Sequence, residues 1–199
     1  MIKVVLATGN AGKLRELQAL LAGNGIEVLS QSALGIHKVE ENGASFLENA
    51  LLKARNAARQ TGLPAIADDS GLEVDALGGA PGVYSARYAG AGASDADNLE
   101  KLLTELRSIS ADKRTARFRC IMAYVRQAND PTPVICEGIW EGHILETPRG
   151  SNGFGYDPVF LVPEKNRSCA ELPSVEKNRL SHRGQALRKL VEQLATPDR

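Results

Sequence analysis

The sequence is poor in aromatic residues and cysteine, has no long apolar run and carries no net charge. Aromatic residues make up 5% of the 199-residue chain, and 24 basic residues balance 24 acidic ones. This balance argues against a protein that coats nucleic acid through a broad phosphate-binding face. No stretch approaches the roughly 18 apolar residues that a membrane helix needs, so no membrane association is expected. The apolar and charged fractions, 43% and 24%, are ordinary for a folded domain and disfavour disorder or a coiled coil.

The three cysteines, Cys120, Cys136 and Cys169, form no paired motif of the kind that binds metal. Their odd number and wide spacing predict reduced thiols, as in a cytoplasmic protein. The N-terminus enters an apolar run at Ile2 and lacks the layout of a signal peptide. We therefore expect a cytoplasmic protein that folds as one domain over residues 1–199.

Apolar periodicity predicts strands and helices that alternate in the first half of the chain. Residues 2–7 and 26–30 resemble buried strands, and the leucines between them have helical spacing. Ser45-Phe46-Leu47-Glu48 has the form of a capping box that opens a second helix. Successive strands at residues 118–126, 133–140 and 143–147 are expected to form an antiparallel portion, and residues 159–162 are expected to form one more strand. These patterns predict an α/β fold with a mixed sheet, arranged in two lobes with a cleft between them.

A glycine-containing turn, Thr8-Gly9-Asn10-Ala11-Gly12-Lys13, follows the first predicted strand and opens a helix. Glycines let the backbone approach an anion, and a helix start supplies free N–H donors and the positive end of the dipole. Lys13 adds a full charge. The spacing differs from that of a P-loop. A phosphate-binding turn and an ordinary turn with an exposed lysine fit it equally well.

Paired acidic residues, Asp68-Asp69, follow the short apolar run that starts at residue 65. Adjacent strand residues point to opposite faces, so both carboxylates can line one site only if the strand has ended. Ser70-Gly71 indicates that it has. Carboxylates at a strand end suit Mg²⁺, although turns are also rich in these residues. A second pair, Glu40-Glu41, fits a solvated loop.

Two further segments carry groups suited to a nucleotide. In Gly153-Phe154-Gly155-Tyr156-Asp157 two glycines flank a Phe ring, which could stack on a nucleobase. A hairpin turn with one core aromatic residue is the simpler interpretation. His182 and Arg183 fall in the predicted first turn of the last helix, where cations are unfavourable without a bound anion or acceptor. A surface capping turn is the alternative there.

Taken together and in order, these segments resemble the inosine triphosphate pyrophosphatase family. The matching stretches span nearly the whole chain; they are Leu6–Lys13, Ser45–Ala50, Ala67–Leu72, Gly79–Tyr88, Gly153–Pro158 and Ser181–Gly184. The resemblance implies an elongated α/β fold with a mixed sheet and a long substrate cleft between two lobes. It also implies Mg²⁺-dependent hydrolysis of dITP, ITP and XTP to the monophosphate and pyrophosphate, by a homodimer.

The resemblance also implies roles for individual residues. Residues implied to hold the triphosphate are Thr8, Gly9, Asn10, Ala11, Gly12 and Lys13, with added charge from Lys53 and Lys177. Asp69 is the implied general base and metal ligand, with Glu40 as its partner and Glu41 as the alternative. The implied substrate contacts outside the phosphates are Ser70, Phe154 stacked on the purine, Gly155, Tyr156 and Asp157 lining its pocket, and His182 and Arg183 at the base edge.

Three other functions remain as alternatives. A Maf-type nucleotide pyrophosphatase has a related architecture with different loops, and the segments at Phe154 and Ser181–Arg183 argue against it. A non-catalytic nucleotide sensor would keep the phosphate turn and base pocket without needing Asp69 beside a metal. An RNA-binding domain could use Phe154 and the basic residues, but the neutral charge and the few aromatic residues disfavour it.

Overall fold

A computed structural model of the chain describes residues 2–22 and 25–195. The strands are β1 (Ile2–Leu6), β2 (Ile26–Ser30), β3 (Ala65–Val74), β4 (Thr115–Val125), β5 (Val134–Ile144), β6 (Phe160–Val162) and β7 (Arg167–Ser168). The α-helices are α1 (Ala11–Leu21), α2 (Phe46–Thr61), α3 (Asp95–Glu105), α4 (Ser174–Leu180) and α5 (His182–Ala195). Short 3₁₀ turns lie at Asp75–Leu77, Gly82–Arg87, Ala111–Lys113, Asp157–Val159, Pro163–Lys165 and Cys169–Glu171.

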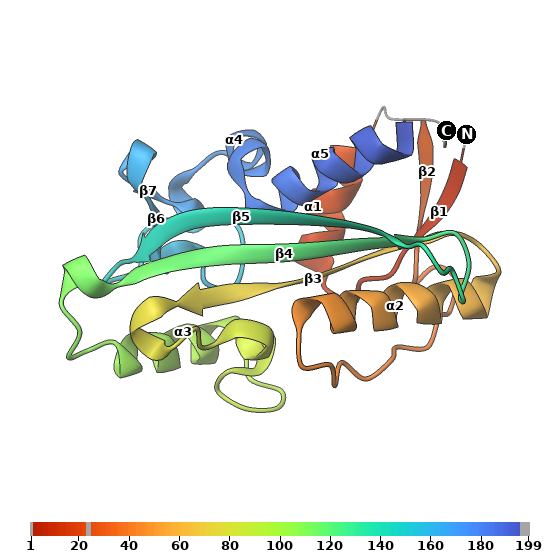
Figure 1. Cartoon of the computed structure of the whole chain (residues 1–199). Helices are drawn as coiled ribbons and strands as arrows, with labels where there is room; N and C mark the ends of the chain where they lie inside the picture. The colour runs from red at the N-terminus through yellow and green to blue at the C-terminus, as the bar shows by residue number, and fades with distance from the viewer. Residues whose placement is uncertain (1, 23–24, 196–199) are drawn as a thin grey trace. The chain divides into compact units, whose positions relative to one another are not determined.

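The strands form one mixed seven-stranded sheet in the order β2-β1-β3-β4-β5-β6-β7 (Figure 1). β1 pairs in parallel with β2 and β3, whereas β5, β6 and β7 pair antiparallel. The α/β class with a mixed sheet is therefore confirmed, including the antiparallel portion expected in the second half of the chain.

The chain divides into two compact units. Unit 1 comprises Met1–Asp69, Cys120–Gly138 and Arg183–Arg199, and unit 2 comprises Ser70–Arg119 and Ile139–His182. In unit 1, buried residues of α1 and α5, among them Leu17 and Leu187, share one apolar cluster with β1, β3 and β4. In unit 2, α3 contributes Leu102 to a second cluster around Trp140 and Phe160. The predicted cleft between lobes stays a prediction.

The strand around Asp68 is longer than the sequence indicated. β3 continues from Ala65 through both aspartates to Val74, so the prediction that it ends at Ser70-Gly71 is wrong. Asp68 and Asp69 are 1% and 7% exposed. The strand can bury them because cationic side chains meet each carboxylate, as described below.

β5 is one strand where the sequence predicted two. The expected break around Glu141-Gly142 is absent, and β5 runs unbroken from Val134 to Ile144. A Cβ at position 142 would lie 2.5 Å from the carbonyl oxygen of Leu161 and 2.6 Å from the Phe160 ring. Gly142 thus marks a close approach of β6 to β5 and not a turn.

Helix α2 begins at the predicted cap, Ser45, but one of the two hydrogen bonds of the predicted capping box has another partner. Ser45 Oγ accepts from the N–H of Glu48, as expected. The Glu48 carboxylate accepts from the N–H of Ala44 and not from that of Ser45, so the predicted box is displaced by one residue. The described helices include none that is long and apolar enough to cross a membrane.

Candidate active site

The turn after β1 is held by local hydrogen bonds at the start of α1. Asn10 caps α1, because its Oδ1 accepts from the N–H of Lys13 at 3.0 Å. The N–H of Asn10 in turn donates to Thr8 Oγ1 at 3.3 Å. A Cβ at position 9 would lie 2.8 Å from Cε and 3.0 Å from Nζ of Lys38. A side chain at position 9 would displace the flexible end of Lys38, which adds a second ammonium group to this turn.

The two aspartates of β3 face opposite sides of the sheet, as alternation along a strand requires. Asp68 Oδ2 accepts from Lys13 Nζ at 3.0 Å and from Arg183 Nε at 3.3 Å. Burial raises the pKa of Asp68, but the charges of Lys13 and Arg183 outweigh it and hold this pKa well below its usual range. Asp68 is therefore ionised and anchors Lys13, the last residue of the turn after β1.

Arg183 is fully engaged with carboxylates in unit 1. Its guanidinium also pairs with Glu16 of α1, and its side chain is 3% exposed. Burial acts to lower the pKa of Arg183, but the carboxylates of Asp68 and Glu16 together have the larger effect. The pKa of Arg183 is therefore raised above its usual value, and the group stays charged. The contacts of Arg183 are those of a link between α1, β3 and α5; its predicted role at the base edge stays a prediction.

Asp69 lies in a second set of contacts, centred on Lys53 of α2. Lys53 Nζ donates to Asp69 Oδ1 at 3.0 Å and to Glu41 Oε2 at 2.7 Å. The other Asp69 oxygen, Oδ2, accepts from Asn49 Nδ2 at 3.1 Å. Glu40 is exposed, whereas Glu41 is half-buried. The structure thus brings Glu41, and not the preferred Glu40, to the contact with Lys53 beside Asp69.

The two carboxylates around Lys53 have pKa values shifted in opposite directions. Burial raises the pKa of Asp69 above its usual value, and the nearby Glu41 adds to this effect while Lys53 opposes it. Burial also acts to raise the pKa of Glu41, but Lys53 and Lys13 lower it overall.

The donor set fits Mg²⁺. One ammonium group already bridges Glu41 and Asp69, so these oxygens converge on a single cation. In the part of the chain that the structure describes, no group of three or more His, Cys, Asp or Glu residues could hold a metal ion. A pair of carboxylates is nevertheless the protein share that Mg²⁺ commonly takes, because water and substrate phosphates supply the remaining ligands.

The residues predicted to stack on the purine and to line its pocket lie in unit 2, in the loop Gly153–Asp157, called the base loop below. Asp157 Oδ2 accepts from the N–H of Phe154 at 2.9 Å and from Lys177 Nζ at 2.7 Å. Gly153 has φ +81°, and a Cβ there would lie 2.0 Å from the same Asp157 oxygen. The loop therefore closes on the Asp157 carboxylate, which only glycine at position 153 permits.

Lys177 and His182 are both buried within unit 2. Lys177 Nζ lies 4.9 Å from the centroid of the Phe154 ring, in addition to its bond to Asp157. The sequence grouped Lys177 with the phosphates; its contacts in the structure are with the base loop. His182 stacks on Phe118, with ring centroids 4.8 Å apart and planes inclined by 14°. Ser70 lies within β3, half-buried.

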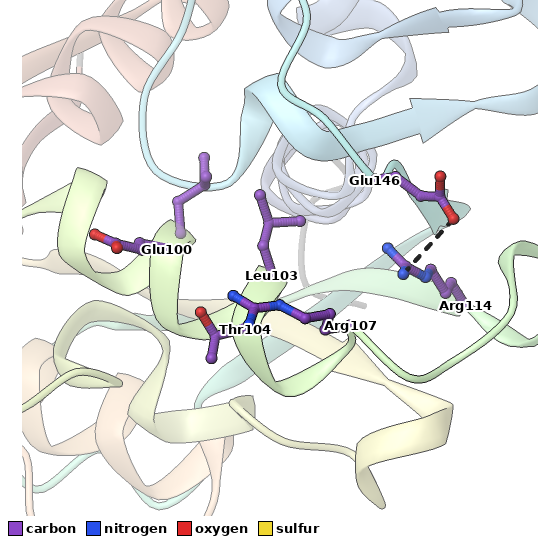
Figure 2. A pocket seen from close by; sticks show the side chains of 7 residues that line it. Glu100, Leu103, Thr104, Arg107, Arg114 and Glu146 are labelled. Carbon is purple, nitrogen blue, oxygen red and sulfur yellow. Dashed lines mark ion pairs between the residues drawn. The ribbon is translucent and has the colours of Figure 1, made fainter.

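A separate hollow of about 590 Å³ lies beside α3 in unit 2. Figure 2 shows Arg107 and Thr104 on one side of it and the ion pair between Arg114 and Glu146, 3.8 Å apart, on the other. The Arg114 guanidinium donates to the carbonyls of Leu106 and Ile109, beyond the end of α3. None of the predicted site residues lines this hollow.

Comparison with known proteins settles the family. The family model described as "Ham1 family" matches residues 4–193. This chain belongs to the Ham1 family. The assignment confirms the resemblance to the inosine triphosphate pyrophosphatases.

Relatives of the Ham1 chain are similar over nearly its whole length. It is 62% identical over 193 residues to a dITP/XTP pyrophosphatase of Thioalkalivibrio sulfidiphilus, covering 97% of this chain and 98% of the relative. It is 64% identical over 192 residues to a dITP/XTP pyrophosphatase of Methylococcus capsulatus, covering 96% of each. Among solved structures, a HAM1 protein from Coxiella burnetii is 51% identical, with a TM-score of 0.90 and 98% of both chains covered.

Sequence reasoning missed several polar groups that contact the predicted site residues. Asn49 and Lys38 contact predicted residues, yet each looked like an ordinary surface position of a helix or loop. Glu16 lies one helical turn after Lys13, a spacing that places both on one face of α1. This spacing could have identified Glu16 as a neighbour of Lys13 from the sequence alone. Asp95, which contacts the base loop, carried no pattern that set it apart from other acidic residues at a helix start.

Proposed function

We propose that this chain hydrolyses dITP, ITP and XTP to the corresponding monophosphate and pyrophosphate, and so cleanses the nucleotide pool. The observation that carries the proposal is the Lys53 ammonium group bonded to both Glu41 and Asp69. Unit 1 also contains the phosphate turn and Lys13. Membership of the Ham1 family, and relatives about 60% identical that are named dITP/XTP pyrophosphatases, support the choice of nucleotide.

The turn Thr8–Lys13 binds the triphosphate in this proposal. The first N–H groups of α1 point to its N-terminus, where the helix dipole favours an anion. Lys13 and Lys38 supply full charges beside that terminus. Cleavage between the α and β phosphates develops negative charge on the pyrophosphate that leaves, and fixed donors of this kind stabilise it.

Asp69 acts as the general base that takes a proton from the attacking water. Lys53 and Asn49 hold its carboxylate by different oxygens, so its orientation is fixed before substrate arrives. Glu41 and Asp69 would hold Mg²⁺. When bound there, the ion supplies positive charge to the phosphate oxygens and favours a deprotonated water.

Recognition of the purine falls to the loop Gly153–Asp157. Phe154 offers its ring for stacking, and Gly155, Tyr156 and Asp157 line the pocket. Lys177, held by Asp157, fixes the position of the Phe154 ring. Ser70 and His182 complete the substrate contacts in this proposal, as the family resemblance implies.

We propose further that the protein is a cytoplasmic homodimer. The three cysteines are buried and form no disulfide, which fits a reducing compartment. Light scattering of the purified chain tests the oligomeric state, and a mass near that of one chain contradicts the dimer.

Pyrophosphate release from dITP, ITP, XTP, ATP and GTP with Mg²⁺ tests the function. We expect turnover of the first three well above that of ATP and GTP. Asp69→Asn should lower kcat by about 10²–10⁴-fold, because an amide cannot take the proton. Asp75→Asn is the matched control: Asp75 pairs with Arg117 in unit 2 and should leave turnover unchanged. Nucleotide binding without pyrophosphate release would identify a sensor and overturn the proposal.

A further inference from the structure

The base loop is held from outside by a residue of α3. The N–H of Gly155 donates to Asp95 Oδ2 at 2.8 Å, across 60 positions of sequence. We propose that Asp95 is a positioning residue that sets the affinity of the base loop for purine nucleotides. This inference rests on the proposed function, since it concerns the same base pocket.

Asp95 does not act as a cap of its own helix. The capping box at the start of α3 is made by Ser94 and Asp97, each bonded to the backbone N–H of the other. The Asp95 carboxylate, in the same first turn, accepts from the loop instead. The N-terminus of α3 would favour an acidic side chain for its charge alone, but charge alone does not direct that carboxylate to a distant N–H.

The contact acts at the residue next to the stacking ring. Gly155 follows Phe154 and has φ +59°, a conformation that glycine adopts without strain. Phe154 is tied on its other side through its own N–H to Asp157. Two carboxylates, Asp95 and Asp157, therefore hold consecutive N–H groups of the loop and fix the direction of the ring between them.

A third contact anchors the loop to the core of unit 2. Tyr156 Oη donates to the carbonyl of Ser85 at 2.8 Å, and Tyr156 is 5% exposed. This buried bond holds the end of the loop that leads into Asp157. Asp95, by contrast, is exposed. Removing its carboxylate frees Gly155 while Tyr156 keeps the loop attached, so the expected loss is one of positioning and not of folding.

The test compares Asp95→Ala, Asp95→Asn and Asp97→Ala in the full chain. Asp97 is the matched control, because it has the same charge in the same helical turn and bonds to Ser94. Three quantities are measured for each variant: KM and kcat for ITP, the Kd of IMP by calorimetry, and the inhibition constant of inorganic tripolyphosphate, which has no base. Thermal unfolding reports folding.

Asp95→Ala should raise both KM for ITP and the Kd of IMP about tenfold, because it removes one charge-assisted hydrogen bond. Its kcat and the tripolyphosphate constant should not change. Asp95→Asn keeps an acceptor and should recover most of the affinity, and Asp97→Ala should keep wild-type values for all ligands even if it lowers Tm.

Three outcomes overturn the inference. Unchanged affinities in Asp95→Ala mean that the contact has no effect on the pocket, and tighter binding means that the carboxylate competes with the purine for the N–H of Gly155. A parallel loss of tripolyphosphate binding also overturns it, since that points to general destabilisation. If the wild type turns over no nucleotide, the proposed function has failed, and the IMP affinities still decide the role of Asp95.

Discussion

Arg183 and Asp68 form a buried ion pair in unit 1, with Nε and Oδ2 3.3 Å apart and side chains 3% and 0% exposed. A charge buried to this extent is tolerated only when paired. Asp68 also holds Lys13 of the phosphate turn. Glu16, Arg183, Asp68 and Lys13 therefore form a series of ion pairs of alternating charge that starts and ends on the same face of α1.

Arg183→Ala should destabilise the protein by about 3–5 kcal/mol, because it leaves a buried carboxylate with one partner fewer. Urea unfolding measures this loss. Where the variant stays folded, kcat/KM should fall by a similar factor for ITP and ATP, since the lost contact orients Lys13 and not the base. A fall confined to ITP would instead support the predicted role of Arg183 at the base edge.

Asp68 should contribute to the pH dependence of the free energy of unfolding. Its folded pKa is depressed below the ordinary value of 3.8 by Lys13 and Arg183, against the effect of burial. The unfolded chain therefore binds a proton that the folded chain does not, and the stabilisation present above pH 3.8 is lost as pH falls. Asp68→Asn should reduce the slope of unfolding free energy against pH, below about pH 4, by up to about 1.4 kcal/mol per pH unit. Equal slopes in the two proteins would contradict the assignment.

Local patterns were enough to predict the first part of the fold. The apolar runs around β1 and β2, and the cap at Ser45, act over a few residues, and the structure has them where the sequence placed them. Ser70-Gly71 misled because these residues are typical of turns, yet in β3 they continue a strand. The strand continues because Asp68 and Asp69 pair with cationic side chains from distant parts of the chain. No local sequence pattern indicates these pairings.

The contacts among the candidate site residues could not be predicted from the sequence either. The partners Asp68 and Arg183 are 115 positions apart, so no spacing in the sequence joins them. The motif around Glu40 and Glu41 fits either residue as a metal ligand. Only the position of Lys53, fixed by the packing of α2, favours Glu41.

Lys13→Ala should weaken triphosphate binding by roughly ten- to a hundredfold, as expected for loss of a charge-assisted contact. KM for ITP and the inhibition constant of tripolyphosphate should rise together, because both ligands need the phosphate turn. Lys3→Ala is a suitable control, since Lys3 is exposed and pairs loosely with Glu27 at 3.8 Å. If KM and the inhibition constant are unchanged in Lys13→Ala, residues 8–13 form a turn that does not bind phosphate.

The last prediction separates Glu41 from Glu40. Lys53 Nζ lies 2.7 Å from Glu41 Oε2 and 3.0 Å from Asp69 Oδ1, so the first carboxylate is in place to share a cation with the second. Glu41→Gln should raise the Mg²⁺ concentration needed for half-maximal turnover by about tenfold or more, the lower bound being the effect of residues that only support a metal ligand. Glu40→Gln, one position away and exposed, should leave that concentration unchanged. An excess of chelator should stop turnover in every variant. Titration of ITP turnover against Mg²⁺ measures all of these. The reverse result, with Glu40→Gln the more affected, would show that substrate binding rearranges the segment before α2 and that the contact of Lys53 with Glu41 belongs to the free protein alone.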